Sequence, residues 1–290
     1  MTETHTTVVS AKALETMLDA STPLRIFDCR ARLGDPDQGR VLFAEGHIQG
    51  AIHADLDTDL AGQPGNQGRH PLPNFDAWLT QVQQWGLQDQ EQVVLYDDMG
   101  GQMAARGWWM FRWLGHEATA VLDGGLPRWQ RPLESGVAKT SSPSDFQPKQ
   151  TLTRLWQVGD VEQNLNESTH QLVDARSVER WRGEQEPIDP VAGHIPKALC
   201  LPSTGNLTPS GLFKSAEDLR ERFANVSSTN TVCYCGSGVT ATHNILARRH
   251  AGLAEPVLYA DSWSGWITDS SRPIAPVSYT HLRAHETVDY

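Results

Sequence analysis

Short apolar segments alternate along the chain with longer segments of helical character. In the second half, residues 171–174, 231–234 and 257–260 are short and apolar, which is typical of buried strands. Residues 239–250, between the last two, have the composition and spacing of a helix. Short buried strands separated by helices predict an α/β fold in which each sheet is mostly parallel and has helices on both faces.

The two halves of the chain repeat the same markers in the same order. An Asp-x-Arg signature, a Gly-His-Ile turn, a strand with a polar residue at its end and a tryptophan each occur twice at a nearly constant separation. The pairs are 26–30 with 172–176, 46–48 with 193–195, 93–97 with 231–235, and Trp129 with Trp266. This internal repeat predicts two similar domains in tandem.

The repeat also predicts where the domains begin and end. We expect a first domain over residues 8–134 and a second over 151–275, joined by a linker over 135–150 that is rich in Ser, Pro and Lys. Residues 276–290 have no apolar period and no counterpart in the first half. We therefore expect them to form a tail outside the fold, either appended or disordered, with non-native coding sequence as an open alternative.

Composition and charge exclude several classes of protein. Of the 290 residues, 39% are hydrophobic and 20% charged, and the net charge of −11 disfavours nucleic acid as a partner. The chain has no apolar run long enough to cross a membrane and no secretory signal at its polar N-terminus. Its four cysteines are too few and too scattered for a disulfide framework, so we expect reduced thiols in a cytoplasmic protein.

The segment 235–241, Cys-Gly-Ser-Gly-Val-Thr-Ala, carries the predicted chemistry. Cys235 follows a buried strand and precedes a helix, at the carboxyl edge of the sheet where α/β proteins bind ligands. The glycines allow the backbone N–H groups of the loop to point inward, and the helix adds its positive end. Both effects favour a thiolate, and later a persulfide, on Cys235. The predicted substrate-binding residues are Gly236, Gly238, Val239 and Thr240.

The other interpretation of Cys235 is a small buried hydrophobic residue, the usual role of a lone cysteine. The Gly, Ser and Thr residues around it are unsuited to a packed core and suited to an anion site. For Cys233, inside the strand, we expect a core role, with a resolving thiol as the alternative. Cys29 and Cys200 show nothing beyond packing.

The loop resembles the active-site loop of the tandem rhodanese family, in particular of its 3-mercaptopyruvate sulfurtransferases. The signatures 174–176 and 193–196 and the Trp-rich segment 261–266 resemble the same family, and the resemblance covers about residues 8–275. It implies two tandem rhodanese-like domains, of which the first is inactive and has Asp97 in place of the cysteine. It also implies that a sulfur donor leaves its sulfur on Cys235, that a thiophilic acceptor takes it, and that no cofactor is needed.

The resemblance further implies the substrate contacts. Arg180 matches an arginine that holds the carboxylate of the donor, which suits a planar guanidinium. A second arginine is expected about nine residues later, where this chain has Ile188 and Asp189 instead. Asp57 and His70 match an Asp–His pair that the family places opposite the cysteine and the loop serine, here Ser237, so Cys235, Ser237, His70 and Asp57 form the predicted catalytic set.

Several other functions compete with this prediction. Thiosulfate sulfurtransferase activity is the nearest alternative, although the neutral Gly236 and Ser237 favour a donor with a carboxylate and a carbonyl. A cysteine phosphatase would need an arginine at position 241 or 240, where this chain has Ala241 and Thr240, so that class is excluded. A rhodanese-like binding or regulatory module fits the first half but not the second. Cys233 and Cys235 lack the spacing of a metal site, so no metal is predicted. The acceptor stays open among cyanide, thioredoxin, a small thiol and a protein.

Overall fold

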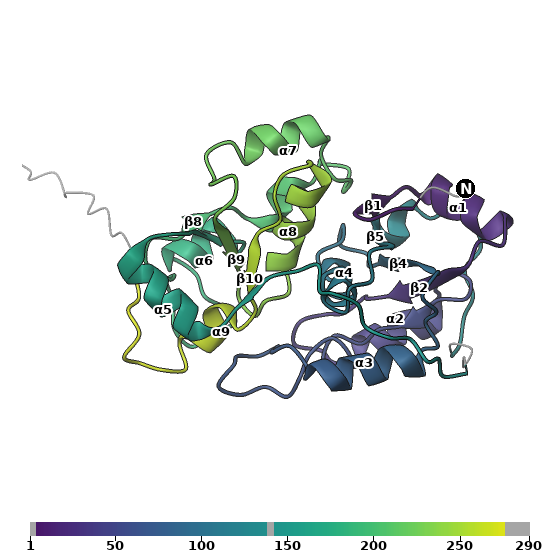
Figure 1. Cartoon of the computed structure of the whole chain (residues 1–290), viewed down its shortest axis with the longest axis horizontal. Coiled ribbons are helices and arrows are strands. Elements are labelled where there is room, and N and C mark those ends of the chain that lie inside the picture. Colours follow the sequence, from purple (N-terminus) through teal and green to yellow (C-terminus); the bar gives the residue numbers. More distant parts are fainter. Residues whose placement is uncertain (1–3, 138–141, 276–290) are drawn as a thin grey trace, which may run out of the picture.

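The computed structural model describes residues 4–137 and 142–275, which form two α/β units (Figure 1). Each unit has a five-stranded, fully parallel sheet, in the order β1-β5-β4-β2-β3 in the first and β6-β10-β9-β7-β8 in the second. The same strand order in both units confirms the fold class and the internal repeat. The predicted tail, residues 276–290, lies outside the described residues.

The elements of the first unit alternate between strands and helices. They are β1 (Val8–Val9), α1 (Ala11–Asp19), β2 (Leu24–Asp28), α2 (Gln38–Glu45), β3 (Ile52–His53), α3 (Phe75–Gln84), β4 (Gln92–Tyr96), α4 (Ala104–Trp113), β5 (Thr119–Leu122) and the 3-10 helix η1 (Leu126–Arg128).

The second unit repeats this alternation. Its elements are β6 (Leu155–Trp156), α5 (Val158–Glu167), β7 (Gln171–Asp174), α6 (Val178–Arg182), β8 (Leu199–Cys200), η2 (Ser203–Asn206), α7 (Ala216–Arg222), β9 (Thr231–Tyr234), α8 (Ala241–His250), β10 (Val257–Tyr259) and α9 (Ser262–Trp266). The predicted strands at 171–174 and 231–234 are confirmed residue for residue, and the predicted helix at 239–250 begins two residues later because its first residues form the loop after Cys235.

All strands lie inside the predicted domain limits of 8–134 and 151–275, which remain predictions. The described part of the predicted linker is not a free connection. Phe146 is buried in the core, and the backbone N–H of Lys149 donates to the carbonyl of Leu114. Residues 142–150 therefore pack along the first unit, although their sequence has no helical or strand period.

Alternation along the strands sends side chains to both faces of each sheet. In β4, Val93 and Leu95 point to one face, whereas Val94 and Tyr96 point to the other, where they meet residues of α1 and α2. The outer face of the second sheet is covered in the same way by α5 and α9. Both sheets are thus buried on both sides, which explains why their strands are short continuous apolar runs.

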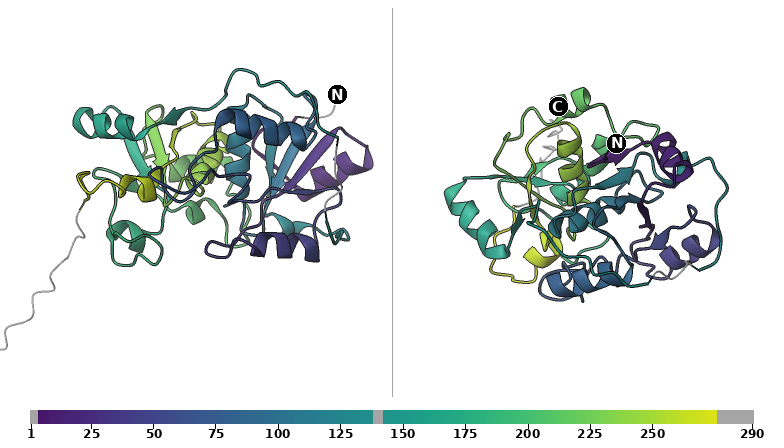
Figure 2. Two further views of the ribbon diagram at one scale, coloured as in Figure 1. Left: turned by 90° about the horizontal axis from the view of Figure 1, so that it is seen from below. Right: turned by 45° about the vertical axis from the view of Figure 1, so that its right-hand side comes forward.

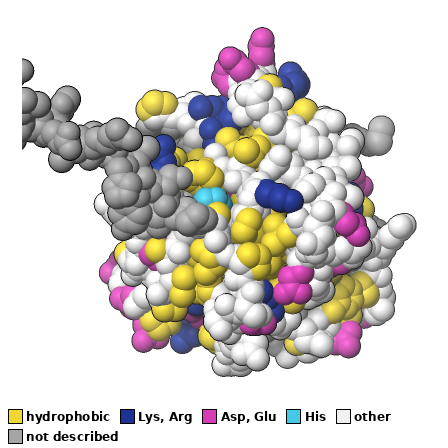
Figure 3. All heavy atoms as spheres, turned by 90° about the vertical axis from the view of Figure 1, so that its left-hand side faces the viewer, with side chains coloured by type: hydrophobic (Ala, Val, Ile, Leu, Met, Phe, Trp, Pro, Cys, Tyr) yellow, Lys and Arg dark blue, Asp and Glu magenta, His cyan; other side chains and the backbone are white. Residues whose placement is uncertain are grey.

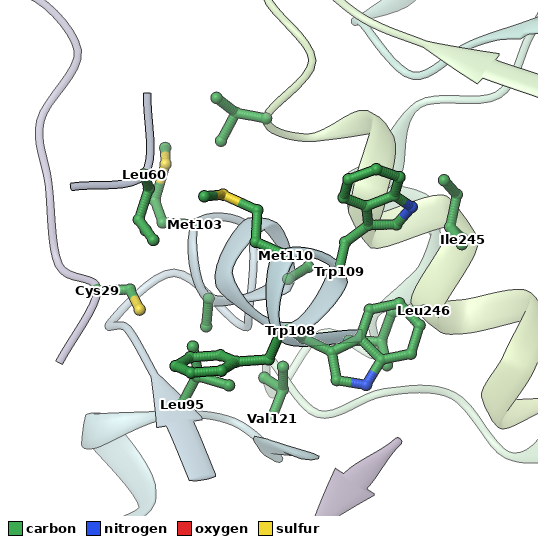
Figure 4. Packing of buried hydrophobic residues seen from close by; sticks show 14 of the residues in the cluster. Cys29, Leu60, Leu95, Met103, Trp108, Trp109, Met110, Val121, Ile245 and Leu246 are labelled. Carbon is green, nitrogen blue, oxygen red and sulfur yellow. The ribbon is translucent and has the colours of Figure 1, made fainter. Parts of the chain in front are cut away.

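The inner faces of the two sheets share one hydrophobic cluster. Helices α4 and α8 lie side by side between the sheets (Figures 1 and 2), and their apolar residues belong to the same cluster. In Figure 4, Trp109 of α4 points toward Ile245 of α8. The two units are therefore joined by a core and not only by polar surface contacts.

The repeated sequence markers are a structural device. The Arg30 guanidinium donates to the Asp28 carboxylate and to the carbonyl of Gly46, and Arg176 contacts Asp174 and Gly193 in the same way. In the first unit the Tyr96 hydroxyl donates to Asp28 and accepts from the N–H of Ile48. This network ties the Gly-His-Ile turn to the sheet in each unit, because buried charges must be paired.

On the face shown in Figure 3, acidic and basic side chains lie among apolar ones. Among the described residues, every helix is too short or too polar to cross a bilayer.

Because the two units share a core, we expect them to unfold together. Replacing Trp109 with Ala should lower the free energy of unfolding by about 3–5 kcal/mol, since a fully buried indole leaves a cavity between the units. Val41→Ala, at an exposed apolar position on α2, is the control and should change it by no more than about 0.5 kcal/mol. Calorimetry should show one transition for the unaltered protein; two separated transitions would contradict the shared core.

Candidate active site

Cys235 lies at the carboxyl end of β9, at the junction of the two units. It is buried, with 2% of its surface exposed, and its backbone N–H donates to the Ser262 hydroxyl at 3.1 Å. The backbone N–H groups of Trp263 and Ser264 donate to the carbonyls of Cys235 and Gly236. These bonds fix the start of the loop against α9, as expected for a residue at the carboxyl edge of a parallel sheet.

The loop after Cys235 curls before it enters α8. Gly238 has a φ of +75°, and a methyl group there would collide with the carbonyl oxygen of Ala260, so only glycine fits. In the part of the chain that the structure describes, the backbone N–H groups of residues 236–240 have no hydrogen-bond acceptor. Buried N–H groups without acceptors are rare, which makes this loop a candidate anion site.

The equivalent loop of the first unit binds a carboxylate. Asp97 occupies the place of the cysteine and is completely buried, and its carboxylate accepts four backbone N–H bonds of 2.7–3.0 Å, from Met99, Gly101, Met103 and Ala104. Burial raises the pKa of Asp97, while the four N–H bonds oppose that shift. The first unit therefore holds a carboxylate of its own in the cradle where the second unit has a sulfur atom.

The structure brings the predicted serine, histidine and aspartate into one chain of contacts. Ser237 Oγ lies 2.7 Å from Nδ1 of His70, and Nε2 of His70 lies 3.2 Å from the Asp57 carboxylate. Burial is the main reason that the pKa of His70 falls to about 4, although the negative charge of Asp57 opposes the shift. A neutral ring beside a carboxylate carries its proton on Nε2, so Nδ1 accepts from the Ser237 hydroxyl.

The predicted substrate-binding residues belong to this loop, except Arg180, which lies beside it. Val239 is buried, and Thr240 is the residue before the first turn of α8. Arg180 lies beside Gly236, but its Nε and Nη2 atoms already contact Glu186, and Nη2 also contacts Asp189 at 2.9 Å. Arg180 is therefore placed as predicted, while acidic partners take up part of its hydrogen-bonding capacity.

Two arginines of the first unit were not predicted from the sequence. Arg106 of α4 is fully buried and donates to the carbonyls of Leu60, His70 and Gly238. Burial lowers its pKa to about 10, so it remains a cation at neutral pH, and Cys235 is among the groups that favour its charge. An arginine near the start of the apolar run of α4 was the available sequence signal. Arg69 precedes His70 and reaches Asp189 across the junction.

Ser262 was also missed. Its φ of +55° is unusual for a residue with a side chain, and the corresponding residue of the first unit is Gly125, with a φ of +60°. The Ser262 hydroxyl accepts the N–H of Cys235 and donates to the carbonyl of Tyr259. The second unit thus bears a strained residue directly beside the cysteine, a position at which strain is often functional.

The surroundings of the other three cysteines agree with the packing role expected for them. Burial raises the pKa of Cys29, and it raises the pKa values of Cys200 and Cys233 to about 12, so all three thiols stay protonated at neutral pH. His47 and His194 each donate a ring N–H to a backbone carbonyl and stack on an aromatic ring, which agrees with a structural role. Within residues 4–137 and 142–275, no group of three His, Cys, Asp or Glu side chains is arranged to hold a metal ion.

Known proteins resemble both halves of the chain. The model of the rhodanese-like domain matches residues 10–132 and 157–269. A probable 3-mercaptopyruvate sulfurtransferase of Pseudomonas aeruginosa is 45% identical over 264 residues, which is 87% of this chain and 92% of that protein. A putative thiosulfate sulfurtransferase of Mycobacterium tuberculosis is 34% identical over 92% of this chain and 96% of its own.

Solved structures agree with these sequence relatives. The Escherichia coli protein SseA, whose structure is described as that of a 3-mercaptopyruvate sulfotransferase, superposes with a TM-score of 0.77 and 30% identity, over 90% of this chain and all of that one. The family model covers most of both units, and the relatives match nearly the whole length. The chain therefore belongs to the rhodanese family, as a sulfurtransferase with two rhodanese domains in tandem.

Proposed function

We propose that the chain moves sulfur from 3-mercaptopyruvate, through a persulfide on Cys235, to a thiophilic acceptor. The observation that supports this most directly is the pair of equivalent loops. In one, four backbone N–H groups surround the Asp97 carboxylate, and in the other the N–H groups of residues 236–240, which follow Cys235, have no acceptor among the described residues. A cradle built for an anion suits a thiolate and, after transfer, a persulfide.

The proposed first step balances without a cofactor. The Cys235 thiolate attacks the sulfur of the donor, the carbon–sulfur bond breaks, and its electron pair leaves on pyruvate as an enolate. The proton of the donor's thiol goes to that enolate, so the products are pyruvate and an anionic persulfide. The Ser237 hydroxyl, with its proton acceptor His70, is in position to carry this proton.

In the second step the outer sulfur passes to an acceptor nucleophile, and Cys235 returns as a thiolate. Cyanide would leave as thiocyanate and a thiol as a persulfide, with thioredoxin among the candidate protein acceptors. Arg106 supports both steps, because a buried cation stabilises the charge of the loop in the thiolate and in the persulfide. All four cysteines are free, which supports our proposal that the protein works in the reducing cytoplasm.

Incubation with 3-mercaptopyruvate alone should add one sulfur atom to the protein, measured by intact mass and located on Cys235 by peptide mapping. Cys235→Ser should gain no sulfur and lose turnover while keeping its fold. Cys233→Ser is the matched control and should still be labelled, since the Cys233 thiol is protonated and faces the core. Turnover retained by the Cys235 variant would contradict the mechanism.

Steady-state comparison of 3-mercaptopyruvate and thiosulfate, with cyanide as acceptor, tests the donor. We expect a higher kcat/KM for 3-mercaptopyruvate, since Gly236 and Ser237 bring no cation of their own to a dianion. A preference for thiosulfate would instead support the alternative that the Mycobacterium tuberculosis relative suggests.

The pH dependence of His70 tests the proton path. Its pKa of about 4 lies below the ordinary value of 6.5, so the ring should stay neutral as the pH falls from 8 to 5.5, and NMR titration of its ring nitrogens should show a midpoint near 4. Asp57→Asn should move that midpoint lower, because the carboxylate favours the charged ring, and should slow turnover. A midpoint at 6.5 or above would be incompatible with a buried neutral base.

A further inference from the structure

Two guanidinium groups, one from each domain, converge on the residue that follows Cys235. A methyl group placed on Gly236 would lie 3.0 Å from Nη2 of Arg69, and 3.4 and 3.5 Å from Nη2 and Nη1 of Arg180. Arg69 belongs to the loop that also carries His70, whereas Arg180 belongs to α6. The two cations therefore border the same small space beside the nucleophile, although they are far apart in the sequence.

Each guanidinium has one nitrogen near Gly236 that the protein does not use. Arg180 engages Glu186 and Asp189 through Nε and Nη2, and Arg69 engages Asp189 through Nη1. Among the described residues, Nη1 of Arg180 and Nη2 of Arg69 have no hydrogen-bond acceptor. Each is a charged donor, so together they offer an anion one bond from each domain.

Asp189 holds the two guanidinium groups in place. Its side chain is 2% exposed, and its two oxygens contact Arg69 and Arg180, one each. The contacts belong to a row of six alternating charges that ends on Arg69, whose side chain is 29% exposed: Asp174, Arg176, Glu186, Arg180, Asp189 and Arg69. Each inner member of the row is held by an opposite charge on both sides, whereas Arg69, at the end, lies beside Gly236.

We propose that Arg69 is a donor-binding residue: its Nη2, together with Nη1 of Arg180, binds the carboxylate of the sulfur donor, and Asp189 is the positioning residue for both. This inference rests on the proposed function. A carboxylate has two oxygens and can accept one bond from each arginine. The donor then lies over Gly236 with its sulfur toward Cys235.

The same arrangement sets the charge that the site accepts. Asp189 and Glu186 neutralise much of the positive charge of the arginines, so the space beside Gly236 suits a single carboxylate better than a dianion such as thiosulfate. Asp189 is therefore a determinant of donor specificity as well as of geometry.

Replacement of Arg69 tests the contact. Arg69→Met should raise the KM for 3-mercaptopyruvate about tenfold or more, the loss expected for a charge-assisted hydrogen bond, with a smaller change in kcat. Arg69→Lys keeps the positive charge but not the planar guanidinium, so its KM should lie between those of the unaltered protein and of Arg69→Met. Arg32→Met is the matched control, because Arg32 makes a two-pronged contact with Asp98 beside the loop of the first domain, and its KM should not change. An unaltered KM in Arg69→Met would overturn the inference.

Replacement of Asp189 tests the specificity. Asp189→Asn keeps the size of the side chain and removes its charge, so kcat/KM for thiosulfate should rise relative to that for 3-mercaptopyruvate by several-fold. An equal fall for both donors would mean that Asp189 only supports the fold, and would overturn its role in specificity.

Persulfide formation on the unaltered protein distinguishes a failure of the proposed function from a failure of the role of Arg69. If 3-mercaptopyruvate places no sulfur on Cys235 of the unaltered protein, the proposed function fails. If it does so, and Arg69→Met has an unchanged KM, the function stands and the role of Arg69 alone is wrong.

Discussion

The proposed chemistry depends on holding a negative charge at a buried junction between two domains. Cys235 is almost completely enclosed, and burial of an anion is costly unless hydrogen bonds and cations compensate for the lost water. The second domain provides the loop N–H groups and the end of α8. The first domain provides Arg106, which contacts the carbonyl of Gly238. It also provides Arg69 and His70, which lie beside Gly236 and Ser237. Neither domain alone surrounds the sulfur.

This requirement gives a physical reason for joining the two domains so closely. The loop of the first domain holds its own Asp97 carboxylate, while other residues of that domain complete the candidate site of its neighbour. The shared core of α4 and α8 sets the distance between the domains. Because hydrogen bonds tolerate only small errors in distance, a packed core is the means by which contacts such as that of His70 with Ser237 are kept.

The two copies of one fold also show how a duplicated domain diverges. The Asp-x-Arg network and the Gly-His-Ile turn recur in both copies because they stabilise the sheet. The residues around the loops differ, with Asp97 against Cys235 and Gly125 against Ser262, as expected if only one copy carries a reactive sulfur. Conserved features thus belong to the fold, and differences between the copies point to the chemistry.

The sequence by itself determined the α/β class, the duplication and the strands at 171–174 and 231–234, and it proposed Cys235 as the nucleophile, because apolar periodicity and local loop chemistry involve residues close together in the chain. The resemblance to a known family added His70, Asp57, Ser237 and Arg180. Only the tertiary structure decided that Arg69 and Arg106 reach the site and that Asp189 lies between two arginines. The contacts of Arg69 with Asp189 and of Arg106 with Gly238 join residues of different domains, and no local pattern encodes the packing of α4 against α8 that brings them together.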